Sequence, residues 1–154
     1  MSLNDLVTPE AVIPSLKANG KKQALLELSE KAAQLSGIEA REIFDALNQR
    51  ERLGSTGIGG GIAIPHGKLA SCEKIFGLFA RLERPIEFEA LDDAPVDLIF
   101  LLIAPENAGA DHLNALSRAA RMLRDQSLLA MLRSTRDPSA LYSILVRSPT
   151  SNAA

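Results

Sequence analysis

Apolar residues recur at helical spacing in five segments of the chain, and each segment has a recognisable start or end. Gly37 follows the first segment as a C-terminal cap, and the pair Asp137-Pro138 opens the last one as a cap and first turn. The predicted helices cover residues 21–36, 39–52, 112–123, 127–133 and the stretch after Asp137. Their apolar faces carry Ala24, Leu25, Leu28, Ala32 and Leu35; Ile43, Ala46 and Leu47; Leu113, Leu116, Ala120 and Leu123; and Leu141, Ile144 and Leu145.

Four shorter apolar runs predict strands. Residues 96–103 are almost continuously apolar, which is typical of a central strand covered on both faces, and Pro105 ends the run. The strand at Val12-Ile13 is confined to an edge or a bulge by Pro14. The other two strands cover 62–64 and 75–82, and a turn at Arg84-Pro85 follows the second.

Strands alternating with helices predict an α/β fold, a single layered domain with a mixed β-sheet flanked by helices. We expect this domain to occupy residues 1–147 and a frayed C-terminal tail to occupy 148–154. A chain of 154 residues with 46% hydrophobic residues and a mean hydropathy of +0.05 suits one domain with a sizeable core.

Charge and composition exclude several classes of function. The net charge is −2, the isoelectric point is about 5.7 and basic runs are absent from the sequence, so we expect neither nucleic acid nor an anionic membrane as partner. The longest apolar run, 98–104, is too short to insert into a membrane. A single cysteine, Cys72, and an N-terminus without signal-peptide features predict a cytoplasmic protein.

The candidate chemistry is concentrated in residues 55–68. Gly57, Gly59 and Gly61 can expose consecutive N–H groups to an anion, beside the hydroxyls of Ser55 and Thr56. Pro65 stiffens the chain that enters His66, whose neutral ring can act as a nucleophile near pH 7. Such a site suits phosphoryl transfer. A glycine-rich turn followed by a partly buried histidine explains the same spacing, and spacing alone leaves both readings open.

Arg50 and His112 are further candidate site residues, and each also has a purely structural explanation. Arg50 lies in the last turn of the second predicted helix, where a solvated cation complements the helix dipole. His112 lies where the third predicted helix begins, a common place for a surface histidine. Two histidines from distant segments, without a carboxylate or cysteine cluster, make a poor metal site, so we expect no metal.

The runs Arg50-Glu51-Arg52-Leu53-Gly54, Ser55-Thr56-Gly57-Ile58-Gly59 and Gly61-Ile62-Ala63-Ile64-Pro65-His66-Gly67-Lys68 resemble a known active-site segment. It is that of the phosphotransferase-system IIA proteins of the fructose/mannitol class, and the sequence is most similar to the nitrogen-regulatory type. The resemblance extends over residues 6–144 and implies the IIA type 2 fold.

The resemblance also implies the roles of individual residues. His66 would carry the phosphoryl group, with Arg50 and His112 close to it, and Ser55, Thr56 and the loop N–H groups of Gly57, Gly59 and Gly61 would steady its oxygens. It implies a stoichiometric phosphocarrier that takes the group from an HPr-like carrier protein and regulates target proteins according to its phosphorylation state. Neither cofactor nor metal is then needed, because the phosphoryl group arrives already activated on nitrogen.

Three alternatives stay open on the sequence. The chain can be the IIA component of a sugar transporter that passes the phosphoryl group to a IIB partner. It can be a nucleotide-binding enzyme that uses the glycine loop, although Leu69 stands where a P-loop has Ser or Thr after Gly67-Lys68. It can also be a non-catalytic binding module in which His66 is inert.

Overall fold

The computed structural model describes residues 3–147, which form one mixed α/β domain. In chain order the elements are a 3₁₀ turn η1 (Pro9–Ala11), β1 (Val12–Leu16), α1 (Lys21–Ser36), α2 (Ala40–Arg52), β2 (Gly57–Gly59), β3 (Ile62–Ala63), β4 (His66–Leu69), β5 (Phe76–Ile86), β6 (Val96–Pro105), α3 (Ala110–Met122), α4 (Gln126–Ser134) and α5 (Pro138–Val146). The predicted fold class, a mixed sheet flanked by helices, is confirmed.

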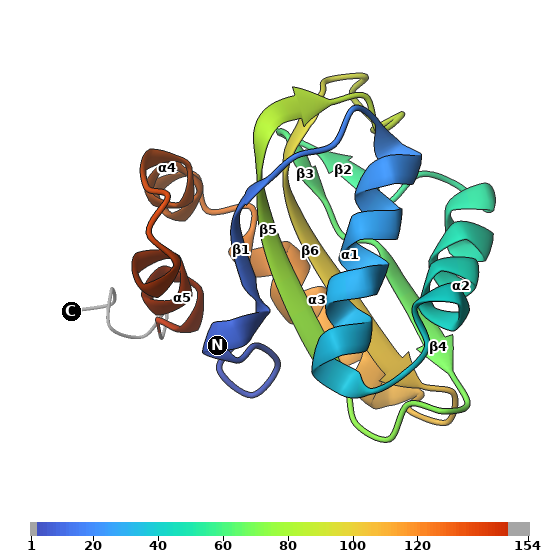
Figure 1. The fold of residues 1–154 in the computed structure, drawn as a ribbon. Coiled ribbons are helices and arrows are strands. Elements are labelled where there is room, and N and C mark those ends of the chain that lie inside the picture. Colours follow the sequence, from blue (N-terminus) through green and yellow to red (C-terminus); the bar gives the residue numbers. More distant parts are fainter. Residues whose placement is uncertain (1–2, 148–154) are drawn as a thin grey trace.

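Strand β6 lies at the centre of the sheet. The strand order is β1-β5-β6-β3-β2, and β4 pairs with β6 beyond β3. Both β3 and β4 run parallel to β6, at its two halves, whereas β5 runs antiparallel to it. Helices α1 and α2 cover one face of the sheet and α3 covers the other, while α4 and α5 lie beside the β1 edge (Figure 1). The apolar run that predicted a central strand is thus buried from both faces.

Most of the predicted elements are confirmed. Gly37 caps α1 in the left-handed conformation, with φ 80°, and Asp137 caps α5 by accepting a hydrogen bond from the Ser139 N–H. Strand β1 is an edge strand whose register with β5 shifts between Ile13 and Leu16, on either side of Pro14. A proline has no N–H for the ladder, and the structure accommodates it at the irregularity.

Several details differ from the prediction. The prediction of a turn at Arg84-Pro85 is wrong. Strand β5 continues to Ile86 and accommodates Pro85 where its register with β6 shifts. Leu35 and Leu113 were expected on apolar helix faces but are 37% and 68% exposed. Helix α3 begins at Ala110, and its buried face carries His112, Ala115, Ala119 and Met122 instead.

The strands β2 and β4 were not predicted, since three glycine-rich residues and the polar sequence of β4 give no apolar run. The predicted tail, 148–154, lies outside the described residues, and the domain boundary at 147 stays a prediction. Within residues 3–147 no helix combines the length and the apolar character needed to cross a bilayer.

Candidate functional site

His66 is the first residue of β4, and its backbone and ring are fixed separately. The backbone pairs with Leu102 of β6. The ring Nδ1 lies 2.9 Å from the Ile64 carbonyl oxygen, which can only accept a hydrogen bond, so Nδ1 carries the proton. The other ring nitrogen, Nε2, accepts a hydrogen bond from Arg50 Nε at 3.2 Å. One neutral tautomer satisfies both contacts, and it leaves the lone pair on Nε2.

Arg50 reaches His66 because α2 packs very closely on β4. A Cβ placed on Gly67 would lie 3.2 Å from the Cβ of Ala46, so only the absence of a side chain allows this approach. Ala46 and Arg50 are four residues apart and lie on the same side of α2. The guanidinium donates a second hydrogen bond, from Nη1 to the Gly54 carbonyl at 2.9 Å, which fixes its orientation.

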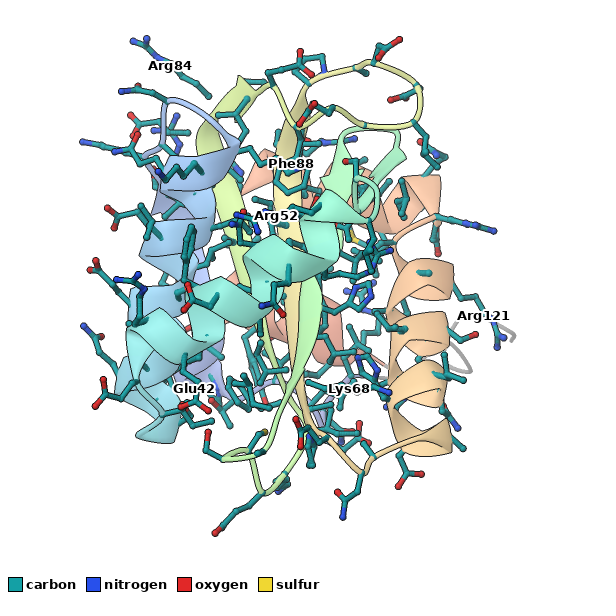
Figure 2. The ribbon with its side chains drawn as sticks, turned by 90° about the vertical axis from the view of Figure 1, so that its right-hand side faces the viewer. Glu42, Arg52, Lys68, Arg84, Phe88 and Arg121 are labelled. Atoms are coloured by element: carbon teal, nitrogen blue, oxygen red, sulfur yellow. The ribbon has the colours of Figure 1, made fainter. Side chains whose placement is uncertain are left out.

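His112 meets the site from the opposite side of the sheet. Its ring centroid lies 5.6 Å from that of His66, and the two rings are tilted by 55°. Strand alternation places His66 and Lys68 on the face opposite Gly67, and Figure 2 shows Lys68 on the α3 side of β4. His112 is only 4% exposed, and its Nε2 has no hydrogen-bond partner among residues 3–147. A buried polar atom without a partner is costly, so this nitrogen is a candidate to meet a ligand.

Both histidines are held in the neutral form. Burial lowers the pKa of His66, and the Arg50 charge lowers it further, against the opposing effects of the Ile64 carbonyl and the Glu51 charge. Burial, His66 and Lys68 lower the pKa of His112 to about 4. Near pH 7 the Nε2 atom of His66 therefore has its lone pair free of a proton, as a nucleophile requires.

The hydroxyls of Ser55 and Thr56 are bonded to protein groups. Ser55 Oγ donates to the Phe88 carbonyl at 2.8 Å and accepts from the Gly57 N–H at 3.0 Å. Thr56 is buried, and its hydroxyl and N–H both donate to the Glu51 carboxylate. To hold a phosphoryl group, either side chain would have to give up these bonds.

The glycine segment forms a β-hairpin between β2 and β3. Gly60 and Gly61 have φ values of 66° and 84°, the consecutive positive values that tight hairpin turns require. The Gly60 N–H donates to Asp92 and its carbonyl accepts from Arg133. Ile62 and His66 pair with β6 four residues apart, which places the turn about 13 Å along the sheet from His66. The hairpin turn thus lies away from His66, and the anion-binding role expected for Gly57, Gly59 and Gly61 stays a prediction.

The prediction missed the buried carboxylate of Glu51. Its side chain is 4% exposed and pairs with Lys21 at 2.8 Å, and Lys21 also lies over the Phe88 ring at 4.9 Å. The signal was present in the sequence: Ile43, Leu47 and Glu51 follow one another at four-residue spacing, so Glu51 continues the apolar face of α2. Within residues 3–147, no three His, Cys, Asp or Glu side chains form a possible metal-binding group.

Comparisons with known proteins agree with this arrangement. The family model described as "Phosphoenolpyruvate-dependent sugar phosphotransferase system, EIIA 2" matches residues 5–148. A nitrogen regulatory protein of Bradyrhizobium diazoefficiens is 60% identical over 153 residues, covering 99% of this chain and 100% of that protein. The nitrogen regulatory protein IIA-Ntr from Neisseria meningitidis has a crystal structure similar to this one, with a TM-score of 0.86 and 34% identity over 91% of this chain and 96% of that chain.

A more distant solved structure shares the fold. It is the complex of enzyme IIA-mannitol and phosphorylated enzyme IIB-mannitol from Escherichia coli, with a TM-score of 0.77 and 22% identity over 91% of this chain and 98% of that chain.

Proposed function

The chain belongs to the EIIA 2 family of the phosphoenolpyruvate-dependent sugar phosphotransferase system, and we propose that it is a nitrogen-regulatory phosphocarrier that accepts a phosphoryl group on His66. The family supports a phosphocarrier role in general, and proteins of this family partner with phosphocarriers and IIB proteins. The finer proposal rests on one observation: Nε2 of His66 is deprotonated and half-buried, and faces a guanidinium.

The proposed donor is an HPr-like carrier that brings the phosphoryl group on a histidine of its own. The donor's N–P bond breaks and its electron pair returns to the donor imidazole, while the lone pair of His66 Nε2 forms the new N–P bond. Nδ1 keeps its proton on the Ile64 carbonyl throughout, so the step needs no proton transfer. The protein mainly supplies position and charge stabilisation, as is general for phosphoryl transfer.

Arg50 and His112 are the proposed contacts of the phosphoryl oxygens. Once Nε2 is bonded to phosphorus it can no longer accept the Arg50 Nε–H, and the nearest new acceptors are the anionic oxygens of the phosphoryl group itself. His112 offers the buried nitrogen that has no partner in the described part of the chain. Ser55, Thr56, Gly57, Gly59 and Gly61 stay proposed contacts of the phosphoryl oxygens, and in the resting site the hydroxyls of Ser55 and Thr56 hold other partners.

The regulatory part of the proposal follows from the change in charge. A phosphoryl group adds a charge of roughly −1.5 to −2, judged by phosphoserine, at a place where the resting site presents Arg50 and two neutral histidines. A target protein that binds the unphosphorylated site would be repelled by the phosphorylated one, or the reverse. The names of the relatives at 60% and 34% identity support the nitrogen-regulatory role.

The test is intact-mass spectrometry at neutral to alkaline pH after incubation with phosphoenolpyruvate, enzyme I and the HPr-like carrier. We expect one acid-labile phosphoryl adduct on the wild-type chain and none on His66→Ala. An adduct of equal yield on His66→Ala, or no adduct from a donor chain that phosphorylates a known acceptor, would contradict the proposal. Transfer onward from the phosphorylated chain to a IIB domain would favour the sugar-transport role in its place.

A further inference from the structure

Three hydrogen bonds, linked through the backbone of Thr56 and of Ile64, connect the buried Glu51 carboxylate to the proton-bearing nitrogen of His66. Glu51 Oε1 accepts from the Thr56 N–H at 3.1 Å. The carbonyl of that same residue, Thr56, accepts from the Ile64 N–H at 3.0 Å. The Ile64 carbonyl then accepts from His66 Nδ1 at 2.9 Å. The two ends of the series are thus a charged carboxylate and the imidazole, with two protein segments between them.

The buried Glu51 carboxylate has at least one partner for each of its two oxygens. Its side chain is 4% exposed, and its two oxygens receive the Thr56 N–H, the Thr56 hydroxyl and the Lys21 ammonium. Burying a charge requires compensation of this kind, and an apolar residue of similar size would serve packing alone without it. Glu51 also directly follows Arg50 in α2, so one helical turn carries both groups that act on the two nitrogens of His66.

We propose that Glu51 is a positioning residue for phosphoryl transfer, which orients His66 through the backbone of Thr56 and Ile64 and makes its ring more electron-rich through the field of its buried charge. The N–H and carbonyl of each of these two residues belong to different peptide groups, so the hydrogen bonds hold the geometry while the carboxylate acts on the ring through space, across a poorly screening interior. This arrangement serves the purpose of a carboxylate that bonds a histidine directly and fixes its tautomer. Only the expected effect of Glu51 on the transfer rate depends on the proposed phosphocarrier function. Its expected effect on the His66 ring does not.

Glu51 stabilises the phosphorylated His66 ring more than the neutral ring of the resting site. When Nε2 forms its bond to phosphorus, the ring gains positive character while Nδ1 keeps its proton. The Nδ1–H to Ile64 bond then becomes charge-assisted, and the Glu51 carboxylate stabilises the positive ring more than it stabilises the neutral ring. Glu51 therefore favours the forward transfer as well as the correct tautomer.

Other charged and titratable groups around His66 act in known directions. Arg50 from α2 lowers its pKa and Glu51 raises it. Lys68 from the same strand and His112 from α3 complete the surroundings, and both are present in every variant compared below. The effect of a substitution at Glu51 on the His66 titration can therefore be measured while these neighbouring groups stay the same.

The test compares Glu51→Gln with Ser29→Ala in the full chain. Glutamine keeps an oxygen for the Thr56 N–H but removes the charge, whereas Ser29→Ala removes a buried hydroxyl of α1 that donates to the Leu25 carbonyl and leaves the series to His66 intact. With His labelled, NMR titration can follow both rings, since the chain has only two histidines. In Glu51→Gln we expect the pKa of His66 to fall further and the rate of phosphorylation by the HPr-like carrier to drop by about tenfold or more.

Ser29→Ala should lower the melting temperature yet leave the His66 titration unchanged and the rate within about twofold of wild type. The double variant Lys21→Met/Glu51→Gln removes the unpaired lysine, so it should regain stability without regaining the His66 titration or the rate. The proposal is overturned if the double variant restores both, or if Ser29→Ala changes them as much as Glu51→Gln does. If no form of the chain is phosphorylated, the proposed function fails, while the His66 titration still decides the role of Glu51.

Discussion

At the scale of single residues, the site depends on giving the two nitrogens of one imidazole different partners. The Ile64 carbonyl holds the proton on Nδ1, and the Arg50 guanidinium excludes a proton from Nε2. The same guanidinium is the strongest available donor for the oxygens of an incoming phosphoryl group. Arg50 thus has one role before transfer and a second role during it.

Removing the Arg50 charge should slow transfer and raise the pKa of His66. We expect Arg50→Gln to lower the phosphorylation rate by about 100-fold, the scale of losing one donor that stabilises developing charge. The pKa of His66 should rise because the cation that lowers it is absent. A quenched-flow time course and an NMR titration measure the two effects.

Arg52→Gln is the matched control, because Arg52 lies in the same last turn of α2 and is exposed. It should leave both the rate and the His66 titration near wild type. Equal losses in Arg50→Gln and Arg52→Gln would show that general positive charge matters and that the contact with Nε2 does not.

His112 should make the folded protein sensitive to mild acid. The unfolded chain protonates this residue at its ordinary pKa of 6.5, whereas the folded chain does so only at about 4. Between those values the unfolded state binds more protons, so stability falls as the pH is lowered through this window. From pH 7 to pH 5 the loss from His112 amounts to about 2 kcal/mol.

Urea unfolding of wild type and His112→Gln at both pH values measures this loss. The variant should lose less stability than wild type on going from pH 7 to pH 5, by about that amount. An identical loss in the two proteins would mean that His112 titrates normally in the folded state.

At the scale of elements, the contact between α2 and β4 decides where Arg50 lies. Gly67→Ala would place a methyl group 3.2 Å from the Ala46 Cβ and 3.5 Å from the Ala46 backbone carbon. The helix backbone cannot yield as a flexible side chain does, so α2 should move away from β4. We expect a loss of about 1–3 kcal/mol in stability and a weaker Arg50–His66 contact, visible as a shifted His66 Nε2 resonance.

Gly77→Ala provides a control with a closer clash in another strand. A methyl group there would meet the Phe100 ring at 2.7 Å, between β5 and β6. It should destabilise the fold and leave the His66 resonance in place. If both variants shift that resonance alike, loss of stability in general would explain the effect.

The elements themselves were largely predictable from the sequence, because apolar spacing and caps report on local structure. What the sequence did not reveal depends on tertiary contacts. Pro85 was expected in a turn, yet β5 accommodates it at a shift of register. Gly60 and Gly61 take positive φ values in a hairpin turn, which the glycine-rich sequence did not distinguish from an anion-binding loop.

At the scale of the whole molecule, two exposed leucines neighbour site residues along the chain. Leu53, 84% exposed, follows α2 directly after the turn that carries Arg50, and Leu113, 68% exposed, follows His112 in α3. Exposed apolar side chains beside a reacting group favour docking of a protein. The local sequence singled out His66 and the resemblance added Arg50 and His112 beside it, but the contacts that α2 and α3 make with His66 are seen only in the structure.

Replacing both leucines with serine should weaken donor docking without changing the chemical step. For Leu53→Ser/Leu113→Ser we expect the KM for the HPr-like carrier to rise by about tenfold while kcat stays within about twofold. Leu26→Ser, on the exposed side of α1, is the control and should change neither value. A fall in kcat at constant KM would contradict a docking role.

The central claim is that Nε2 of His66 receives the phosphoryl group while Nδ1 keeps its proton on the Ile64 carbonyl. A long-range ¹H–¹⁵N correlation spectrum of the phosphorylated, ¹⁵N-His-labelled chain tests it, because the two ring nitrogens give separate signals. We predict a phosphorus coupling at Nε2 of His66 and an Nδ1 that still carries its proton. Coupling at Nδ1, or on His112, would contradict the account.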